Sequence, residues 1–394
     1  MVTKTFDRFT LDAIVQLVEH ANDTLDELRE KMLEPHPRKQ APRFTGAQLA
    51  DLCGIDAKQV SYLASRGDLP PGSFHEGAKR RSFSLGEARL WVQQIAKIPP
   101  KPEGARAASI AVVNFKGGST KTTTAFNLAQ GLTLMGRKVL LVDLDPQGSA
   151  TTLTGLLPAA EVLEEHTAAM ITYPPLDEAP KSLAYAVQDT YWDGLDIIPG
   201  APALFNAEIF LPLHSRNPDI LWWTLVDKAI DPLRDAYDVI IFDTAPALSY
   251  LAVNAVIAAD ALLMPLPPEN LDYASSVAFW NLLSETLMAL SQSRGYEKDF
   301  AFMRILLSKV DSQSISSAVV KDWILRTYAA YVMTVEIPKS MVSSVSSAQF
   351  GTVYDIGHYE GSAKTYAKVR DAFDTFVRTI DQTIMATIWH KEAS

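Results

Sequence analysis

The stretch KGGSTKTTT, residues 116–124, follows the apolar run SIAVVNF at residues 109–115 and precedes a long amphipathic stretch that begins at Ala125. This order predicts a strand, a glycine-rich turn and a helix. Gly117 and Gly118 can adopt backbone angles that are barred to other residues, so the N–H groups of the turn can point inward at a polyphosphate. The helix that follows presents the positive end of its dipole at the same place. The segment therefore predicts a phosphate-binding loop, the alternative being a glycine turn without a ligand.

Two side chains of this loop have the chemistry that a nucleoside triphosphate requires. Lys121 is placed to reach the β- and γ-phosphates, and the hydroxyl of Thr122 is placed to bind Mg²⁺. The loop departs from the common pattern GxxxxGKS or GxxxxGKT, because position 120 holds threonine and a second lysine, Lys116, opens the loop. A β-branched residue disfavours positive φ. If the loop needs that angle at Thr120, we expect a weaker affinity.

Length and composition set wider limits. A chain of 394 residues predicts two or three domains, and 47% hydrophobic with 21% charged residues is ordinary for a globular protein. The single cysteine, Cys53, excludes an intramolecular disulfide and a cluster held by several cysteines of one chain. The first residues, MVTKTFDRFTLD, lack an apolar signal core, and no segment has the length and hydrophobicity of a membrane span. We expect a cytoplasmic protein without stable membrane association.

The charge is unevenly spread along the chain. The net charge is −10, but residues 35–106 hold 12 Lys and Arg against 6 Asp and Glu. Residues 1–34 and residues 107–394 are both acidic. One short basic segment on an acidic protein indicates a local site for a polyanion such as DNA.

The N-terminal segment predicts one amphipathic helix over residues 7–34, which ends before Pro35. Its apolar residues recur at three- and four-residue steps: Ile14, Leu17, Val18, Ala21, Leu25 and Leu28. The helix either packs on its own domain or pairs with the same helix of a second copy, and we assign residues 1–36 as a dimerisation helix.

Residues 44–72 have the pattern of a helix-turn-helix. Thr45 and Asp56 can each cap a helix, and Gly54 ends the first one. Ala50 and Val60 meet the steric needs of two helices that cross closely. The residues expected to face DNA from the second helix are Lys58, Gln59, Ser61 and Tyr62.

The next segment, FHEGAKRRSFSLGEARLWV (residues 74–92), predicts a two-stranded wing and a helix that starts near Ser84. The wing would present Lys79, Arg80 and Arg81 to DNA, and this layout resembles the winged domains of MerR-like regulators. The alternative is a small helical domain with solvated basic side chains. We assign residues 37–98 to a winged helix-turn-helix domain and the proline-containing residues 99–108 to a linker.

Residues 109–394 alternate apolar strands with helical segments. Such continuous apolar runs are typical of a parallel sheet covered on both faces, so we expect a doubly wound α/β domain with a P-loop, preceded by the small N-terminal domain. The predicted strands are residues 109–115, Val139–Asp143, Leu195–Pro199, Val239–Asp243, Ala261–Pro265, Phe302–Leu307 and Val332–Ile337.

Carboxylates follow two of these strands. Asp143 and Asp145 end VLLVDLD, and Asp243 ends VIIFD. The carboxyl ends of parallel strands form the ligand-binding edge of such a sheet, although each aspartate alone could be a helix or turn cap. Because Mg²⁺ prefers carboxylates and water, we expect Asp243 to hold the metal through water.

From about residue 109 to 355 the chain resembles the larger ParA-type DNA partition ATPases, which have an N-terminal DNA-binding domain. Residues 116–124 match the deviant Walker A motif of that family, VLLVDLDPQGSAT (139–151) matches Walker A′, and FDTAPALS (242–249) matches Walker B. IPKSMVSSVSSAQFGTVYD (337–355) resembles a further family motif. The departures are Thr120 for glycine, Ala245 where many members have proline, and Lys339-Ser340 for Arg-Asn.

The resemblance implies a slow, Mg²⁺-dependent ATPase. In that family the lysine at position 116 reaches the nucleotide of the partner in a homodimer, Asp145 orients the attacking water, and Asp143 supports the metal site. The implied ATP-binding residues are Lys116, Gly117, Gly118, Ser119, Thr120, Lys121, Thr122, Thr123 and Pro338.

The resemblance also implies partners and a cellular place. The N-terminal domain would bind an operator and repress the partition genes, and the ATP-bound dimer would bind DNA without sequence preference. A ParB-type centromere-binding protein would stimulate hydrolysis, and the protein would associate with the nucleoid. The basic residues considered for non-specific DNA contacts are Lys321, Arg326, Lys339, Lys364 and Lys368.

The sequence also bears on three other functions. A MinD-like membrane-cycling ATPase shares the motifs and would use a C-terminal amphipathic helix, here with Phe373, Phe376, Val377, Ile380, Ile384 and Ile388 on one face, although that face is also typical of core packing. An ATP-sensing repressor with little hydrolysis would follow if Thr120 blocks turnover. A nitrogenase-reductase-like electron carrier is excluded by the lack of cysteines.

Overall fold

The computed structural model describes residues 9–33, 39–74, 80–340, 351–356 and 361–390. The chain divides into two compact units, Met1–Gln40 and Ala41–Ser394. The first unit contains helix α1 (Leu11–Leu33), which confirms the predicted helix. Its apolar residues Ile14, Leu17 and Val18 are exposed. Dimerisation through this face stays a prediction, as do Leu25 and Leu28, whose side chains lie outside the description.

The second unit begins with the helix-turn-helix. Helices α2 (Gly46–Cys53) and α3 (Ala57–Arg66) start at the predicted caps, because Thr45 and Asp56 each accept a backbone N–H and form a capping box. Gly54 ends α2 with φ +65°, a conformation that glycine adopts without steric cost. Helix α4 (Leu85–Ile95) starts at Ser84, also as predicted.

The described part of the wing is smaller than the sequence predicted. Strand β2 (Ser82–Phe83) pairs with β1 (Phe44–Thr45), which precedes α2, and within the described residues a bridge between Ser73 and Ser82 joins the two sides of the predicted hairpin. Residues 75–79, including Lys79, lie outside the described residues. The short strands follow from a segment with few β-branched or apolar residues.

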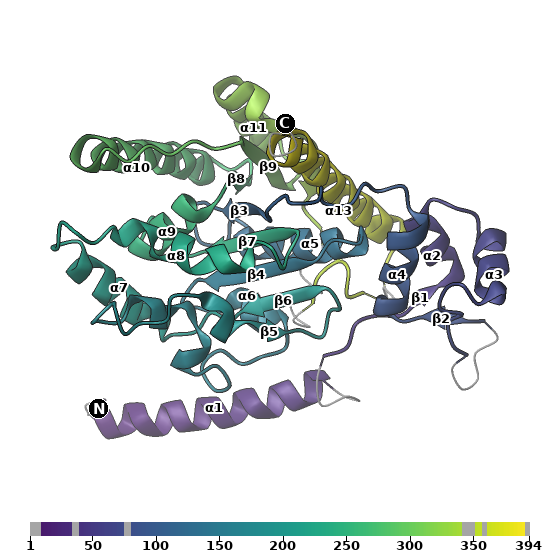
Figure 1. Cartoon of the computed structure of the whole chain (residues 1–394), viewed down its shortest axis with the longest axis horizontal. Helices are drawn as coiled ribbons and strands as arrows, with labels where there is room; N and C mark the ends of the chain where they lie inside the picture. The colour runs from purple at the N-terminus through teal and green to yellow at the C-terminus, as the bar shows by residue number, and fades with distance from the viewer. Residues whose placement is uncertain (1–8, 34–38, 75–79, 341–350, 357–360, 391–394) are drawn as a thin grey trace, which may run out of the picture. The chain divides into compact units, whose positions relative to one another are not determined.

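The main body of the second unit is a sheet of eight strands in the order β10-β9-β8-β3-β7-β4-β6-β5 (Figure 1). All neighbours are parallel except β5 and β6, and all seven strands predicted in this region are present. The strands are β3 (Ala108–Val112), β4 (Val139–Leu144), β5 (Gln188–Asp189), β6 (Leu195–Ile198), β7 (Val239–Thr244), β8 (Ala261–Leu266), β9 (Phe302–Val310) and β10 (Val332–Pro338). The doubly wound α/β fold is therefore confirmed.

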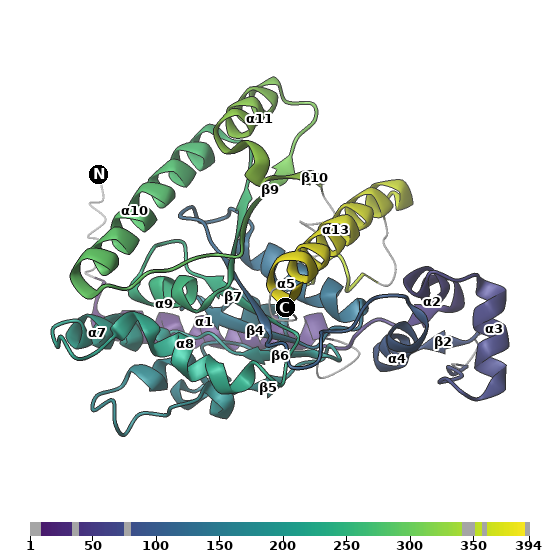
Figure 2. The same ribbon diagram turned by 45° about the horizontal axis from the view of Figure 1, so that its top comes forward.

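Helices cover both faces of this sheet, and side chains alternate between two cores. On one face lie α5 (Lys121–Leu134) and α13 (Ala363–Ile384), with α4 packed beside α5 (Figure 2). The other face carries α7 (Leu204–His214), α8 (Leu225–Ile230), α9 (Tyr250–Ala258), α10 (Asn270–Arg294) and α11 (Ile315–Tyr328). Shorter elements are α6 (Ser149–Leu153), a π turn at Met385–Trp389, and 3₁₀ turns at Glu164–His166, Ala168–Thr172, Leu183–Ala186, Trp222–Thr224, Asp231–Leu233 and Ala329–Tyr331.

The winged segment and the α/β body share one continuous core. Arg89 of α4 is buried and donates hydrogen bonds to the carbonyls of Thr133 (3.1 Å) and Arg137 (3.0 Å), at and beyond the end of α5. Gly194 approaches the Arg89 guanidinium so closely that a Cβ atom would lie 2.0 Å from its central carbon. The division of Ala41–Ser394 into a winged domain, a linker at residues 99–108 and an ATPase domain stays a prediction.

The apolar face of α13 packs inside the protein. Phe373, Phe376, Val377 and Ile380 are buried against α5 and β10, as the core-packing interpretation predicted. Gly131 of α5 permits this approach, since a Cβ there would come within 2.5 Å of Val377. Among the described helices, none combines the length and the hydrophobicity needed to cross a membrane.

Candidate functional site

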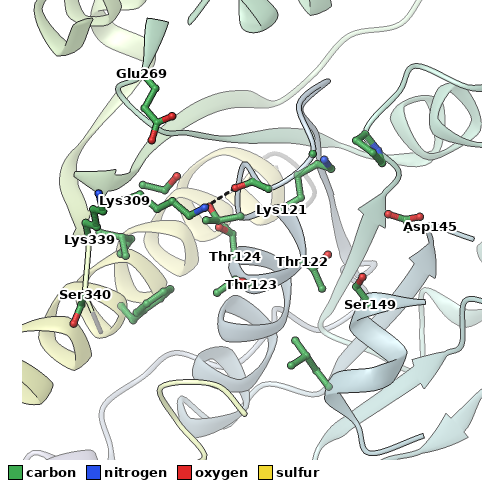
Figure 3. Close-up of a pocket in the computed structure, with 18 of the residues that line it drawn as sticks. Lys121, Thr122, Thr123, Thr124, Asp145, Ser149, Glu269, Lys309, Lys339 and Ser340 are labelled. Carbon is green, nitrogen blue, oxygen red and sulfur yellow. Dashed lines mark hydrogen bonds between the residues drawn. The ribbon is translucent and has the colours of Figure 1, made fainter. Parts of the chain in front are cut away.

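A cavity of about 850 Å³ lies at the carboxyl edge of the sheet, over the start of α5 (Figure 3). It is lined by the loop between β3 and α5, by the ends of β9 and β10, and by α6. The predicted residues that it brings together are Gly117, Gly118, Thr120, Lys121, Thr122, Thr123, Asp145, Pro338 and Lys339. Residues more than 200 positions apart in the sequence therefore share one wall.

The loop before α5 contains a strained backbone residue and hydroxyl groups without hydrogen-bond partners in the described structure. Thr120 has φ +72°, the left-handed conformation that a β-branched residue disfavours. Helix α5 begins without a side-chain cap, and the hydroxyls of Ser119 and Thr120 are buried without a hydrogen-bond partner in the described structure. Unpaired groups at a helix N-terminus are the elements of an anion site.

Lys121 is buried at the floor of the cavity. Its ammonium donates to the carbonyl of Lys116 at 3.3 Å. Burial lowers the pKa of Lys121, and the nearby carboxylates of Asp243 and Asp145 oppose that shift. A buried ammonium group in the cavity favours the binding of an anion.

Asp243, at the end of β7, is fully buried, and neither carboxylate oxygen has hydrogen-bonding geometry with a described group. Burial raises the pKa of Asp243 well above its usual range, and the Asp143 carboxylate adds to this, while the nearby Thr122 hydroxyl lowers the pKa. A buried carboxylate without partners beside a threonine hydroxyl fits a hard cation such as Mg²⁺.

Asp143 differs from Asp243 because its carboxylate has hydrogen-bond partners. Its carboxylate accepts hydrogen bonds from the N–H (2.9 Å) and hydroxyl (2.8 Å) of Thr151, and burial raises its pKa to about 6. Gly200 packs on it so closely that a Cβ would lie 2.7 Å from the carboxyl carbon. Asp145 instead lies in the cavity wall. No group of three or more metal-binding side chains is found among the described residues, so any Mg²⁺ here would need ligand oxygens or water.

Lys116 forms ion pairs within its own chain. Its ammonium contacts Asp272, in the first turn of α10, and lies 3.7 Å from Glu269. The hydrogen bond with Asp272 raises the pKa of Lys116. Burial raises the pKa of Asp272, although the hydrogen bond and the charge of Lys116 lower it. The lysine is therefore held by a carboxylate that is itself poorly solvated.

Comparison with known proteins agrees with this geometry. A family model described as an AAA domain matches residues 107–292. Protein SopA of Escherichia coli K12 is 31% identical over 72% of this chain and 73% of its own length. The chromosome partitioning protein ParA of Myxococcus xanthus is 33% identical over 59% of this chain and 75% of its own length. The chain belongs to the ParA-type family of partition ATPases.

The fold is shared over nearly the whole length of this ParA-type chain. A solved structure described as a partition protein covers 95% of this chain and 98% of its own, with a TM-score of 0.62 and 18% identity. At that identity the likeness concerns the fold alone.

Three residues of the ParA-type site were missed by sequence reasoning. Asp272 and Glu269 hold Lys116, and Lys309 at the end of β9 donates to the carbonyl of Gly118 at 2.7 Å (Figure 3). Each of the three comes at or after the end of an apolar strand, as the predicted aspartates do. This position in the sequence could have identified them as candidate site residues. Which distant strand ends face the loop could not be read from the sequence.

The residues expected to contact DNA from the winged segment lie on its surface. Lys58, Gln59, Ser61 and Tyr62 of α3 are exposed, as are Arg80 and Arg81. The Gln59 side chain accepts the N–H of Asp56, and the Ser61 hydroxyl donates to the carbonyl of Ala57. DNA binding through these groups stays a prediction.

The basic residues considered for non-specific DNA contacts differ in their surroundings. Lys321 pairs with Glu336, and Arg326 pairs with Asp322 at 2.8 Å. Lys339, which lines the cavity, lies 3.7 Å from Asp311. Lys364 and Lys368 are exposed on α13. Acidic partners weaken the case for the first three residues.

Proposed function

We propose that this chain is an ATP-dependent DNA partition ATPase that segregates plasmid or chromosomal DNA. The observation that carries the proposal is the cavity over α5, which is lined by an uncapped helix N-terminus and by buried Lys121. The buried carboxylate of Asp243 lies beneath it, close to Lys121 and Thr122. Such groups favour an anion and a divalent cation together. Mg-ATP supplies both.

The residues of the loop would bind and orient ATP. The N–H groups of Gly117–Thr123 and the ammonium of Lys121 hold the phosphates, and Pro338 closes the far wall of the cavity. Thr122, Asp243 and Asp143 would hold Mg²⁺, Asp143 as a supporting carboxylate. When held there, Mg²⁺ would supply positive charge that offsets the negative charge of the phosphates.

Asp145 would place the attacking water, since its carboxylate lies in the wall of the cavity that holds the phosphates. We expect Lys121→Ala to abolish ATP binding. Asp145→Ala should retain binding and stop hydrolysis. Phosphate release and equilibrium ATP binding are measured for both, with Lys228→Ala on the exposed surface of α8 as the control. Equal hydrolysis by wild type and Asp145→Ala would remove Asp145 from this role.

Lys116 would act across a homodimer, as the family resemblance implies. It must first leave Asp272 and Glu269, and the phosphates of ATP on a second copy offer a stronger counter-charge. ATP thereby becomes a dimerisation ligand, and hydrolysis returns the protein to its starting state. Slow turnover then sets the lifetime of the dimer.

The DNA contacts would be of two kinds. The winged segment carries exposed Lys58, Arg80 and Arg81 and would bind an operator. The ATP-bound dimer would bind DNA without sequence preference on the nucleoid, through exposed basic residues such as Lys364 and Lys368. A ParB-type protein would stimulate hydrolysis.

The test is binding to random-sequence DNA at fixed salt with ATP, ADP or no nucleotide. Binding that requires ATP, is kept by Asp145→Ala and is lost in Lys121→Ala supports the proposal. Binding that ignores nucleotide would favour the second candidate, an ATP-sensing repressor with little hydrolysis. That candidate draws on the strained Thr120, whose φ of +72° departs from what threonine prefers.

A further inference from the structure

The backbone at Lys309 is unusual for a strand end. Lys309 has φ +51°, one of three non-glycine residues with positive φ in the described part of the chain, and another is Thr120 across the cavity. The pairing of β9 with β10 is irregular near this point, with register shifts on both sides of the Leu307–Glu336 pair. Strained backbone of this kind persists where the surroundings hold it, and it gathers at functional sites.

The strained turn directs the Lys309 side chain to the P-loop. Its ammonium donates to the carbonyl oxygen of Gly118 at 2.7 Å, between residues 191 positions apart (Figure 3). The neighbouring residue Ser308 also faces the cavity, and its buried hydroxyl has no partner in the described structure. The end of β9 is thus built into the wall of the nucleotide cavity.

The contact fixes the orientation of one peptide group. The Gly118–Ser119 peptide is trans, so the Gly118 carbonyl and the Ser119 N–H point in opposite directions. When Lys309 holds the carbonyl on its own side, the Ser119 N–H is turned away from Lys309. No acceptor for that N–H is found within the described residues. A peptide carbonyl that points at bound phosphates repels them, whereas a peptide N–H that points at them donates a hydrogen bond.

We propose that Lys309 is a positioning residue of the P-loop, whose ammonium locks the Gly118–Ser119 peptide so that the Ser119 N–H faces the phosphates of a bound nucleotide. The inference rests on the proposed binding of ATP at this loop. It assigns to the chain a second lysine that acts in cis, through the loop and not on the phosphates themselves.

The test uses substitutions that separate the effect of losing the Lys309 ammonium from the effect of relieving the backbone strain. Lys309→Gly removes the side chain and also relieves the positive φ, so the melting temperature should stay the same or rise while Mg-ATP binds about tenfold more weakly. Lys309→Met keeps the length and backbone preference of lysine and should show the same loss. Lys309→Arg retains a cationic donor and should keep most of the affinity.

The control is Ala329→Gly, which relieves another positive φ (+40°) at a residue that does not line the cavity. It should leave ATP affinity unchanged. ADP must show the same loss as ATP in Lys309→Gly, since backbone N–H groups of a P-loop hold the phosphates that both share.

Two results would overturn the inference: wild-type affinity in both Lys309→Gly and Lys309→Met, or a loss confined to ATP, which would place the ammonium on the terminal phosphate. Absence of ATP binding by folded wild type would instead defeat the proposed function. The two failures are therefore distinguishable.

Discussion

The two ends of helix α5 are built in opposite ways. At its start, Thr120 is strained, the helix has no side-chain cap and buried polar groups have no partners in the described structure. At its end, Arg89 donates to the carbonyls of Thr133 and Arg137, and the Arg137 guanidinium is paired with Asp381 at 2.8 Å. The polar groups at the first end can therefore bind a ligand, whereas those at the second end already have partners within the protein.

The end of α5 shows what a completed polar cluster looks like. Cations near a helix C-terminus are favourable, because the last carbonyls carry partial negative charge. Arg137 makes two bonds to the Asp381 carboxylate and lies 4.9 Å from the centre of the Trp389 ring. This cluster joins α5 to α13 and should serve stability.

The largest effect is expected from breaking that ion pair. Arg137 and Asp381 are both almost fully buried, so Asp381→Ala leaves an uncompensated charge and should cost about 3–5 kcal/mol of unfolding free energy. Denaturant unfolding measures the loss. The exposed pair Arg326–Asp322 is the control, and Asp322→Ala should cost less than about 0.5 kcal/mol. A small loss in Asp381→Ala would show that this end is not the stabilising one.

Gly194→Ala should disturb the same end through Arg89. Gly194 has φ +82°, and the new Cβ would lie 2.0 Å from the guanidinium carbon, so strain and overpacking together should cost about 2–4 kcal/mol. Gly104→Ala is matched to it, with φ +80° but no atom within 4 Å, and should cost only about 1–2 kcal/mol. Equal melting temperatures for the two variants would contradict the close contact.

Asp243→Asn should act in the opposite direction at the other end. It removes a buried carboxyl group whose ionised form is disfavoured by burial, so the nucleotide-free protein should gain about 1–2 kcal/mol at neutral pH, and Mg²⁺ should no longer add stability in the presence of ATP. Thermal unfolding with and without Mg-ATP measures both. A variant less stable than wild type without ligand would show that Asp243 has a partner.

The pH dependence follows from the raised pKa values of Asp243 and of Asp143, the latter about 6. The folded protein keeps protons that the unfolded chain releases above about pH 4. These groups therefore contribute stability that is full below that pH and is lost as the pH rises through the folded pKa. The advantage of Asp243→Asn over wild type should grow as the pH rises above about 4, and a constant difference would contradict the shift.

The smallest effect is expected from Thr120→Gly. Glycine relieves the positive φ, but its flexible unfolded chain offsets part of the gain, leaving about 0.5–1 kcal/mol. The melting temperature should rise slightly. ATP should bind as tightly as in wild type or more tightly, and weaker ATP binding would mean that the Thr120 hydroxyl itself contacts the ligand.

The sequence predicted what is local and missed what is distant. The apolar runs predicted the seven parallel strands, and the capping residues Thr45, Asp56 and Ser84 located three helices, because these signals act over a few residues. Strand β5 was missed, since its two residues, Gln188 and Asp189, have no apolar pattern.

The site was predicted in the same partial way. The loop, its lysines and the aspartates came from spacing, and the concern about positive φ at Thr120 matches the structure. The contacts of Lys116 with Asp272 and of Lys309 with Gly118 join residues more than 150 positions apart. These residues come together because of the order of the strands in the sheet. That order cannot be predicted from the sequence pattern of any single strand.

The most direct test of the account is equilibrium binding of ATP, with and without Mg²⁺, to the wild-type protein and to Lys121→Ala. If the unpartnered groups at the start of α5 await Mg-ATP, wild type binds ATP more tightly with Mg²⁺, and Lys121→Ala stays folded but does not bind. Wild type that is folded and fails to bind, or a Lys121→Ala variant that binds as well as wild type, would contradict the account.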